Sequence, residues 1–171
     1  MRSHARLLGH SIHQMLIVFP LGLLATAVLF DLIDLATGTG AFLEAAYWMT
    51  AAGVIGGLVA APFGFIDWLH IPPRTRAKRI GALHGGGNLI VMGLFAASWL
   101  LREPESDVPV TALALALAGV ALALVAAWLG GELVSRLGIG VYDDAGPDAA
   151  SSLHLDNDVP PARDDRTRAD R

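Results

Sequence analysis

The chain contains no cysteine among its 171 residues. It therefore has no disulfide, no haem attached through a cysteine pair, no iron–sulfur cluster held by thiolates and no cysteine nucleophile. Positive charge is also scarce, with 12 Lys and Arg against 16 Asp and Glu. Without a basic excess, the composition predicts no nucleic-acid binding.

The short motifs of common soluble enzymes are missing as well. There is no Ser-His-Asp context, no glycine-rich phosphate loop and no nucleotide fingerprint. The letters HGGGN at residues 84–88 resemble the oxyanion loop of some lipases, but no nucleophile elbow accompanies them. No catalytic residue is identified, and the question of enzyme activity stays open.

Apolar residues are abundant, at 54 % of the chain with a mean hydropathy of +0.53. They gather in four stretches, at residues 12–35, 45–71, 83–101 and 110–137. About 20 helical residues cross the hydrocarbon core of a bilayer, so each stretch is long enough to span it. We therefore expect an all-α, integral membrane four-helix bundle in residues 1–141.

Charges in the loops predict the orientation of this bundle. Arg2 and Arg6 precede the first span, and residues 72–79 between the second and third spans hold four basic side chains. The other two loops hold one basic residue between them. By the positive-inside rule, both termini are expected in the cytoplasm. Arg outnumbers Lys by eleven to one, which is typical of a GC-rich bacterial genome and predicts that the membrane is a bacterial inner membrane. Residues 142–171 are acidic, lack apolar periodicity and are expected to form a disordered cytoplasmic tail.

Small residues recur along two of the spans and predict close helix packing, because helix association in lipid depends on close approach. Pro20 and Pro62 are expected to kink or bend the first and second spans. The small residues at four-residue intervals are Gly53 and Gly57 in the second span and Gly119, Ala123, Ala127 and Gly131 in the fourth.

Each span contributes a polar side chain at about the same depth near the predicted cytoplasmic side. These are His13, Asp67, His84 and Glu132. At about 1.5 Å rise per residue, all four fall within roughly one helical turn of each other. Ionisable residues within a membrane are candidates for a functional site, so we expect the four to converge.

Several interpretations of this convergence remain open. The polar groups could simply pair and fix the helix register of a non-catalytic scaffold or subunit. They could hold a b-type haem between His13 and His84, with Gly85 giving clearance for the macrocycle and Asn88 one turn further along the same face. They could also bind Zn²⁺ or Fe²⁺ through His13, Asp67, His84 and Glu132, or serve transport or proton transfer. Haem, a metal ion and no cofactor are all retained.

On the opposite side of the membrane, Asp31 lies near the C-terminal end of the first span. The helix macrodipole disfavours negative charge there, so the carboxylate needs a partner. Arg102 leaves the third span on the same side. We therefore expect a structural ion pair between Asp31 and Arg102, with Asp34, one turn further along the first span, as the alternative partner.

Four blocks in order resemble one family of bacterial membrane proteins, domain of unknown function 2231. They read GHSIHQMLIVFPLGLLATAVLFDL, GLVAAPFGFIDWLHIPPRTRAKRIGALHGGGN, LFAASWLLR and WLGGELVSRLGIGV, and the resemblance runs from residue 9 to 141. It implies a four-helix integral membrane domain in contact with lipid. Some relatives carry cytochrome-type or Rieske-type modules, which implies membrane redox chemistry and redox partner proteins, but no catalytic activity is established for the family.

The family pattern can be carried over position by position, and it departs from this sequence at Ser11 and Gln14, where relatives often have proline. The positions that match are His10, His13, Phe19, Pro20, Asp31, Asp67, Arg76, His84, Asn88 and Glu132.

Overall fold

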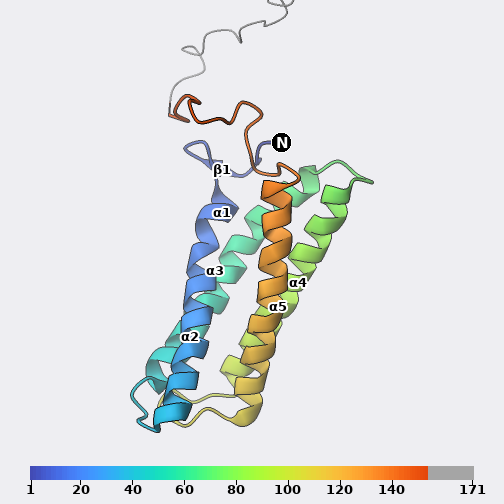
Figure 1. Cartoon of the computed structure of the whole chain (residues 1–171). Helices are drawn as coiled ribbons and strands as arrows, with labels where there is room; N and C mark the ends of the chain where they lie inside the picture. The colour runs from blue at the N-terminus through green and yellow to red at the C-terminus, as the bar shows by residue number, and fades with distance from the viewer. Residues whose placement is uncertain (154–171) are drawn as a thin grey trace, which may run out of the picture.

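The computed structural model describes residues 1–153 and shows four helical crossings side by side (Figure 1). The first crossing is α1 (Ile12–Leu16) continued by α2 (Val18–Thr37). The other three are α3 (Leu43–His70), α4 (Arg76–Leu100) and α5 (Val110–Ser135). All four are long and apolar enough to cross a membrane. The predicted all-α four-helix fold is thus confirmed.

The first crossing is interrupted only at Ile17, between α1 and α2. Pro20 lies one turn further on and has no N–H to donate to the carbonyl four residues before it. The interruption therefore falls where the proline was expected to disturb the helix. Pro62 was expected to disturb the second span in the same way, but it lies within α3, which is not interrupted there.

The third crossing begins earlier than the sequence predicted, at Arg76 rather than near residue 83. The Thr75 hydroxyl accepts a hydrogen bond of 3.1 Å from the backbone N–H of Lys78 and caps the helix. A threonine at this position satisfies one of the free N–H groups of a helix start. Hydropathy missed this turn because its exposed positions are basic.

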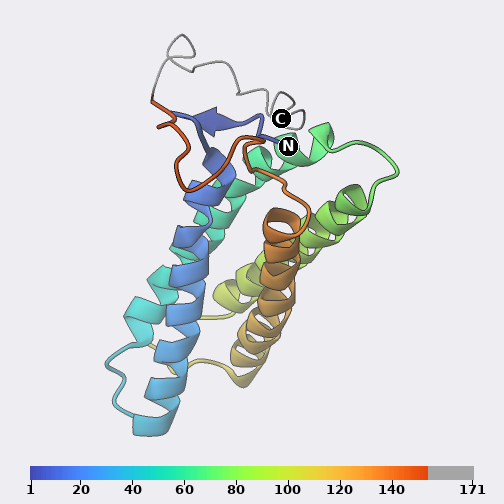
Figure 2. The same cartoon turned by 45° about the horizontal axis from the view of Figure 1, so that its top comes forward.

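The two ends of the bundle differ in what they carry. At one end, the terminal end, lie residues 1–11, the turn between α3 and α4, and the chain after α5 (Figure 1). At the other, the far end, lie the connections from α2 to α3 and from α4 to α5. The closest helix pairs are α2 with α3 and α4 with α5, so the bundle consists of two helical hairpins (Figure 2).

A short irregular cap covers the terminal end. Within residues 1–153, its regular structure is a hairpin of two-residue strands, β1 (Arg6–Leu7) and β2 (His10–Ser11), which the sequence did not predict. The Tyr142 hydroxyl donates to the carbonyl of Gly9 at 2.6 Å, so the start of the expected tail, residues 142–171, packs against this hairpin. Residues 154–171 of that tail lie outside the described residues.

Large apolar side chains face outward along the helices, whereas the contacts between helices are made mainly by small residues. Leu89 and Leu124 are 70 % and 69 % exposed, whereas Ala27 and Ala112 are fully buried. This distribution suits lipid, because apolar burial does not drive helices together there and close approach of backbones does.

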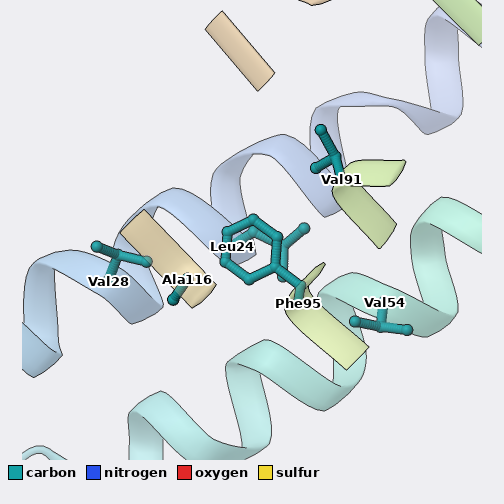
Figure 3. Packing of buried hydrophobic residues seen from close by; sticks show 6 residues of the cluster. All are labelled: Leu24, Val28, Val54, Val91, Phe95 and Ala116. Atoms are coloured by element: carbon teal, nitrogen blue, oxygen red, sulfur yellow. The ribbon is translucent and has the colours of Figure 1, made fainter. Parts of the chain in front are cut away.

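The core lies near the middle of the bundle, around the ring of Phe95. Side chains from α2, α3, α4 and α5 meet there, as Figure 3 shows. Gly119 makes room for this ring, since a Cβ at that position would lie 2.8 Å from Phe95 Cε2. The six buried residues of the cluster are Leu24, Val28, Val54, Val91, Phe95 and Ala116.

The stripe of small residues along α5 follows a different spacing from the one predicted. Steps of four residues led to Ala127 and Gly131, but Ala127 is exposed and a Cβ at Gly131 would meet no atom within 4 Å. Steps of four overshoot the helical repeat of 3.6, so they drift off the interface. The buried positions are separated by four, three, seven and seven residues, and are Ala112, Ala116, Gly119, Ala126 and Leu133.

Replacement of Phe95 by alanine tests the core. The helices remain in an apolar solvent when they separate, so the loss comes mainly from the cavity. We expect the free energy of unfolding to fall by about 2 kcal/mol, measured by detergent-induced unfolding of the purified protein. Leu89→Ala on the same helix is the control, since its exposed side chain should cost almost nothing; equal losses in the two variants would contradict this core.

Candidate functional site

Two histidines from different hairpins face each other in the terminal half of the bundle. His13 is on α1 and His84 is on α4, and their ring centroids are 6.4 Å apart with the ring planes perpendicular. Both side chains are half-buried. Of the four polar residues that the sequence placed at this depth, these two lie together.

The His13 ring lies against α3. Its Nδ1 is 3.0 Å from the carbonyl oxygen of Ala60. A Cβ at Gly64, one turn further along α3, would lie 2.8 Å from Nδ1 and Cε1 of the ring. Glycine at position 64 therefore leaves the space that the ring occupies and keeps the Ala60 carbonyl within its reach.

The His84 ring lies against α5 in the same manner. Its Nδ1 is 2.8 Å from the carbonyl oxygen of Ala126, and a Cβ at Gly130 would lie 2.9 Å from its Cε1. The ring thus rests on the helix backbone at a glycine one turn beyond the accepting carbonyl.

These two contacts fix which ring nitrogen is available for a ligand. A carbonyl oxygen can only accept, so Nδ1 of each histidine must carry the proton and donate it. In the neutral ring, the lone pair is then on Nε2. Asn88 Nδ2 lies 3.4 Å from His84 Nε2 but donates more closely, at 2.9 Å, to the His84 carbonyl.

The two carboxylates of the predicted metal site do not join the histidines. Asp67 accepts hydrogen bonds from the Ser3 hydroxyl and from the backbone N–H groups of His4 and Ala5, at 2.7 to 3.2 Å. It therefore anchors the terminal cap.

Glu132 forms an ion pair with Arg76, whose Nη2 lies 2.6 Å from Glu132 Oε1. Within residues 1–153, no three His, Asp or Glu side chains are grouped so that they could hold a metal ion. Depth along the membrane normal was predicted from the sequence, but the direction in which each side chain points was not. The set of His13, Asp67, His84 and Glu132 is thus not assembled.

Two of the glycines that follow His84 lie where no other part of the described chain packs against α4. A Cβ at Gly85 or Gly86 would meet no atom within 4 Å. Gly85 thus does not contact the histidine rings or a neighbouring helix. The glycines that do contact the rings, Gly64 and Gly130, were not singled out in the sequence, although both follow a Leu-Val-Ala-Ala run by the same spacing.

At the far end, the predicted partners Asp31 and Arg102 lie together in the bundle. Arg102 Nη1 is 2.8 Å from both carboxylate oxygens of Asp31, and the side chains are 3 % and 0 % exposed for Arg102 and Asp31. Nε and Nη2 of the guanidinium donate to the Ser98 hydroxyl, which donates in turn to the Ala112 carbonyl at 2.7 Å. The network joins α2, α4 and α5.

Comparison with known proteins gives one family. A family model described as "Predicted membrane protein (DUF2231)" matches residues 9–143. No curated protein and no solved structure matched the chain. The matched region contains both histidines, both residues of the far-end pair and all four crossings.

The far-end pair can be tested by exchange of its charges. Asp31→Asn and Arg102→Met should each lower the free energy of unfolding by about 3–5 kcal/mol, because each leaves one buried charge uncompensated. The exchanged variant D31R/R102D should recover part of this loss. Detergent-induced unfolding measures all three, with the exposed neighbour Glu103→Gln as the control. An exchange that is as damaging as the sum of the single changes would contradict the pairing.

Proposed function

Because this chain belongs to the DUF2231 family of predicted membrane proteins, we propose that it is a multi-pass protein of the bacterial inner membrane that holds a b-type haem between His13 and His84. The family and the four crossings support the membrane location. The two facing histidines support the haem.

The separation of the two rings carries the proposal. A bond from a metal ion to an imidazole nitrogen is about 2.0–2.1 Å long, so two imidazoles on opposite sides of one metal have centroids roughly 6 Å apart. The rings of His13 and His84 are 6.4 Å apart. Both hold Nδ1 on a backbone carbonyl, which is the usual support of a metal-bound histidine.

The number of ligands favours haem over a bare metal ion. Structural zinc sites take four protein ligands and catalytic ones three, but within the described residues no third His, Asp or Glu joins His13 and His84. A haem iron needs no more than two axial ligands from the protein, because the macrocycle supplies the rest.

The residues of the chain would then have separate tasks. His13 and His84 would hold the haem iron through their Nε2 atoms, and the carbonyls of Ala60 and Ala126 keep the two rings in one orientation. Asn88 would give up its long contact with His84 Nε2 and keep its bond to the His84 carbonyl. A haem with two histidine ligands transfers single electrons, so we propose redox proteins as partners.

Loss of either ring should remove the haem. We expect the protein purified from cells supplied with haem to show a Soret band, and His13→Ala and His84→Ala to abolish it because both rings would be needed to hold the haem in the bundle. His10→Ala is the matched control, since this ring is exposed and hydrogen-bonds to the Leu8 carbonyl in the terminal cap. Size-exclusion profiles check that the variants fold. No Soret band in the unaltered protein would refute the haem and favour a scaffold without a cofactor.

The orientation can be tested directly because the chain has no cysteine. We expect the terminal end in the cytoplasm, since Arg2, Arg6 and the basic turn before and within α4 lie there. A membrane-impermeant maleimide added to intact spheroplasts should label S106C at the far end and not S151C at the terminal end. Labelling of S151C alone would reverse the orientation, and lysed cells provide the control for reactivity.

A further inference from the structure

The two hairpins of the bundle share a sequence pattern. Residues 52–64 read AGVIGGLVAAPFG and residues 118–130 read AGVALALVAAWLG, with eight of thirteen positions identical. These segments lie in α3 and α5, the second helices of the two hairpins. An offset of 66 residues thus relates α3 to α5.

The first helices of the hairpins are related by an offset of 71 residues. This offset pairs His13 with His84, and it also pairs the core residue Leu24 with Phe95. Two further buried pairs follow from it, Ala27 with Ser98 and Asp31 with Arg102.

The contacts repeat with the same two offsets. His13 meets Ala60 and Gly64, and His84 meets the equivalent residues Ala126 and Gly130. In the core, a Cβ at Gly53 would lie 2.6 Å from Leu24 Cγ, and one at Gly119 would lie 2.8 Å from Phe95 Cε2. The equivalent buried positions of the two second helices are Ala46 and Ala112, Thr50 and Ala116, Gly53 and Gly119, and Ala60 and Ala126.

From this repetition we infer that the chain is a tandem duplication of one two-helix unit, in which Gly64 and Gly130 are equivalent positioning residues that seat His13 and His84. Both hairpins start at the terminal end, so an approximate two-fold axis runs along the bundle between them, as in membrane proteins with parallel repeats. The centre therefore offers two equivalent imidazoles to one ligand with two equivalent faces. The part of this inference that concerns the ligand rests on the proposed haem.

We call each carbonyl with the glycine four residues after it, Ala60 with Gly64 and Ala126 with Gly130, the seat of a histidine ring. The seat follows from the geometry of a helix. The carbonyl of residue i points toward residue i+4, so a side chain at i+4 stands beside that oxygen. A glycine at i+4 leaves the carbonyl open to a donor from another helix. Ala60 with Gly64, and Ala126 with Gly130, have this spacing, and in lipid such a hydrogen bond replaces the water that an imidazole would otherwise need.

A double-mutant cycle tests the seat without any cofactor. Gly64→Ala should lower the melting temperature of the full-length protein, because the new methyl group meets the His13 ring. In the H13A background, the same substitution should cost little, because the ring is gone. Gly130→Ala and H84A should behave in the same way. Additive losses in both cycles would overturn the inference.

The core glycines provide the matched control. Gly53→Ala and Gly119→Ala introduce equally close contacts on the same helices, but to Leu24 and Phe95 rather than to a histidine. Both should lower the melting temperature by the same amount with and without His13 or His84. If the histidine background relieved Gly53→Ala as well, general loosening would explain the cycle and the inference would fail.

Ring spectroscopy and haem affinity separate the seat from the proposed function. In ¹⁵N-histidine spectra of the haem-free protein, G64A should move the His13 signals and leave those of His84 in place, and G130A should do the reverse. In the haem-loaded protein, each should weaken haem binding by about 10–100-fold, whereas G53A should not. Ring shifts in a protein that never binds haem would support the seat and refute the haem; haem binding that is unaffected by G64A and G130A would refute the seat alone.

Discussion

An imidazole placed between apolar helices has to find its hydrogen-bond acceptor inside the bundle, because lipid provides none. The backbone carbonyls of a helix are the nearest acceptors, but the following turn normally covers them. Gly64 and Gly130 uncover one carbonyl each, and His13 and His84 donate to these oxygens. The orientation of both rings, and with it any chemistry at this centre, depends on these two exposed carbonyls.

The same requirement explains why the carboxylates near this end do not converge on the histidines. Asp67 finds three donors in the terminal cap, and Glu132 finds Arg76. These carboxylates point toward donors in the terminal cap and on α4, whereas the two imidazoles point toward the carbonyls of α3 and α5. The direction of each side chain therefore separates residues that the sequence places at one depth.

Length and hydropathy were sufficient to predict the four crossings. A membrane span needs about 20 apolar residues, and few other structural elements contain so long an apolar stretch. Charge at a helix end was enough to predict the proximity of Asp31 and Arg102, since few partners exist on that side. The spacing of small residues gave a wrong prediction where the direction around the helix mattered. It indicated Gly131, where a Cβ would meet no atom within 4 Å, and not Gly130, which lies against the His84 ring. Hydropathy missed the first turn of α4, where a threonine cap sets the start. A comparison of the chain with itself would have found both seats, because the Leu-Val-Ala-Ala run precedes each glycine.

The two hairpins are equivalent at the terminal end of the bundle and differ at the far end. At the terminal end, the histidine, the accepting carbonyl and the glycine occur in both hairpins. At the far end, equivalent positions hold opposite charges, Asp31 in one hairpin and Arg102 in the other. Two like charges at these positions would repel each other in a buried site, so divergence into a carboxylate and a guanidinium is what allows the helices to close there.

Ser98 completes this divergence. Its counterpart in the first hairpin is Ala27, which is fully buried and has no hydroxyl. A guanidinium has more donors than one carboxylate can accept, and the Ser98 hydroxyl accepts from Nε and Nη2 of Arg102. The arginine side therefore needs an extra acceptor that the aspartate side does not. Symmetry is thus retained where two identical imidazoles flank one centre, and it is broken where charge balance requires two different partners.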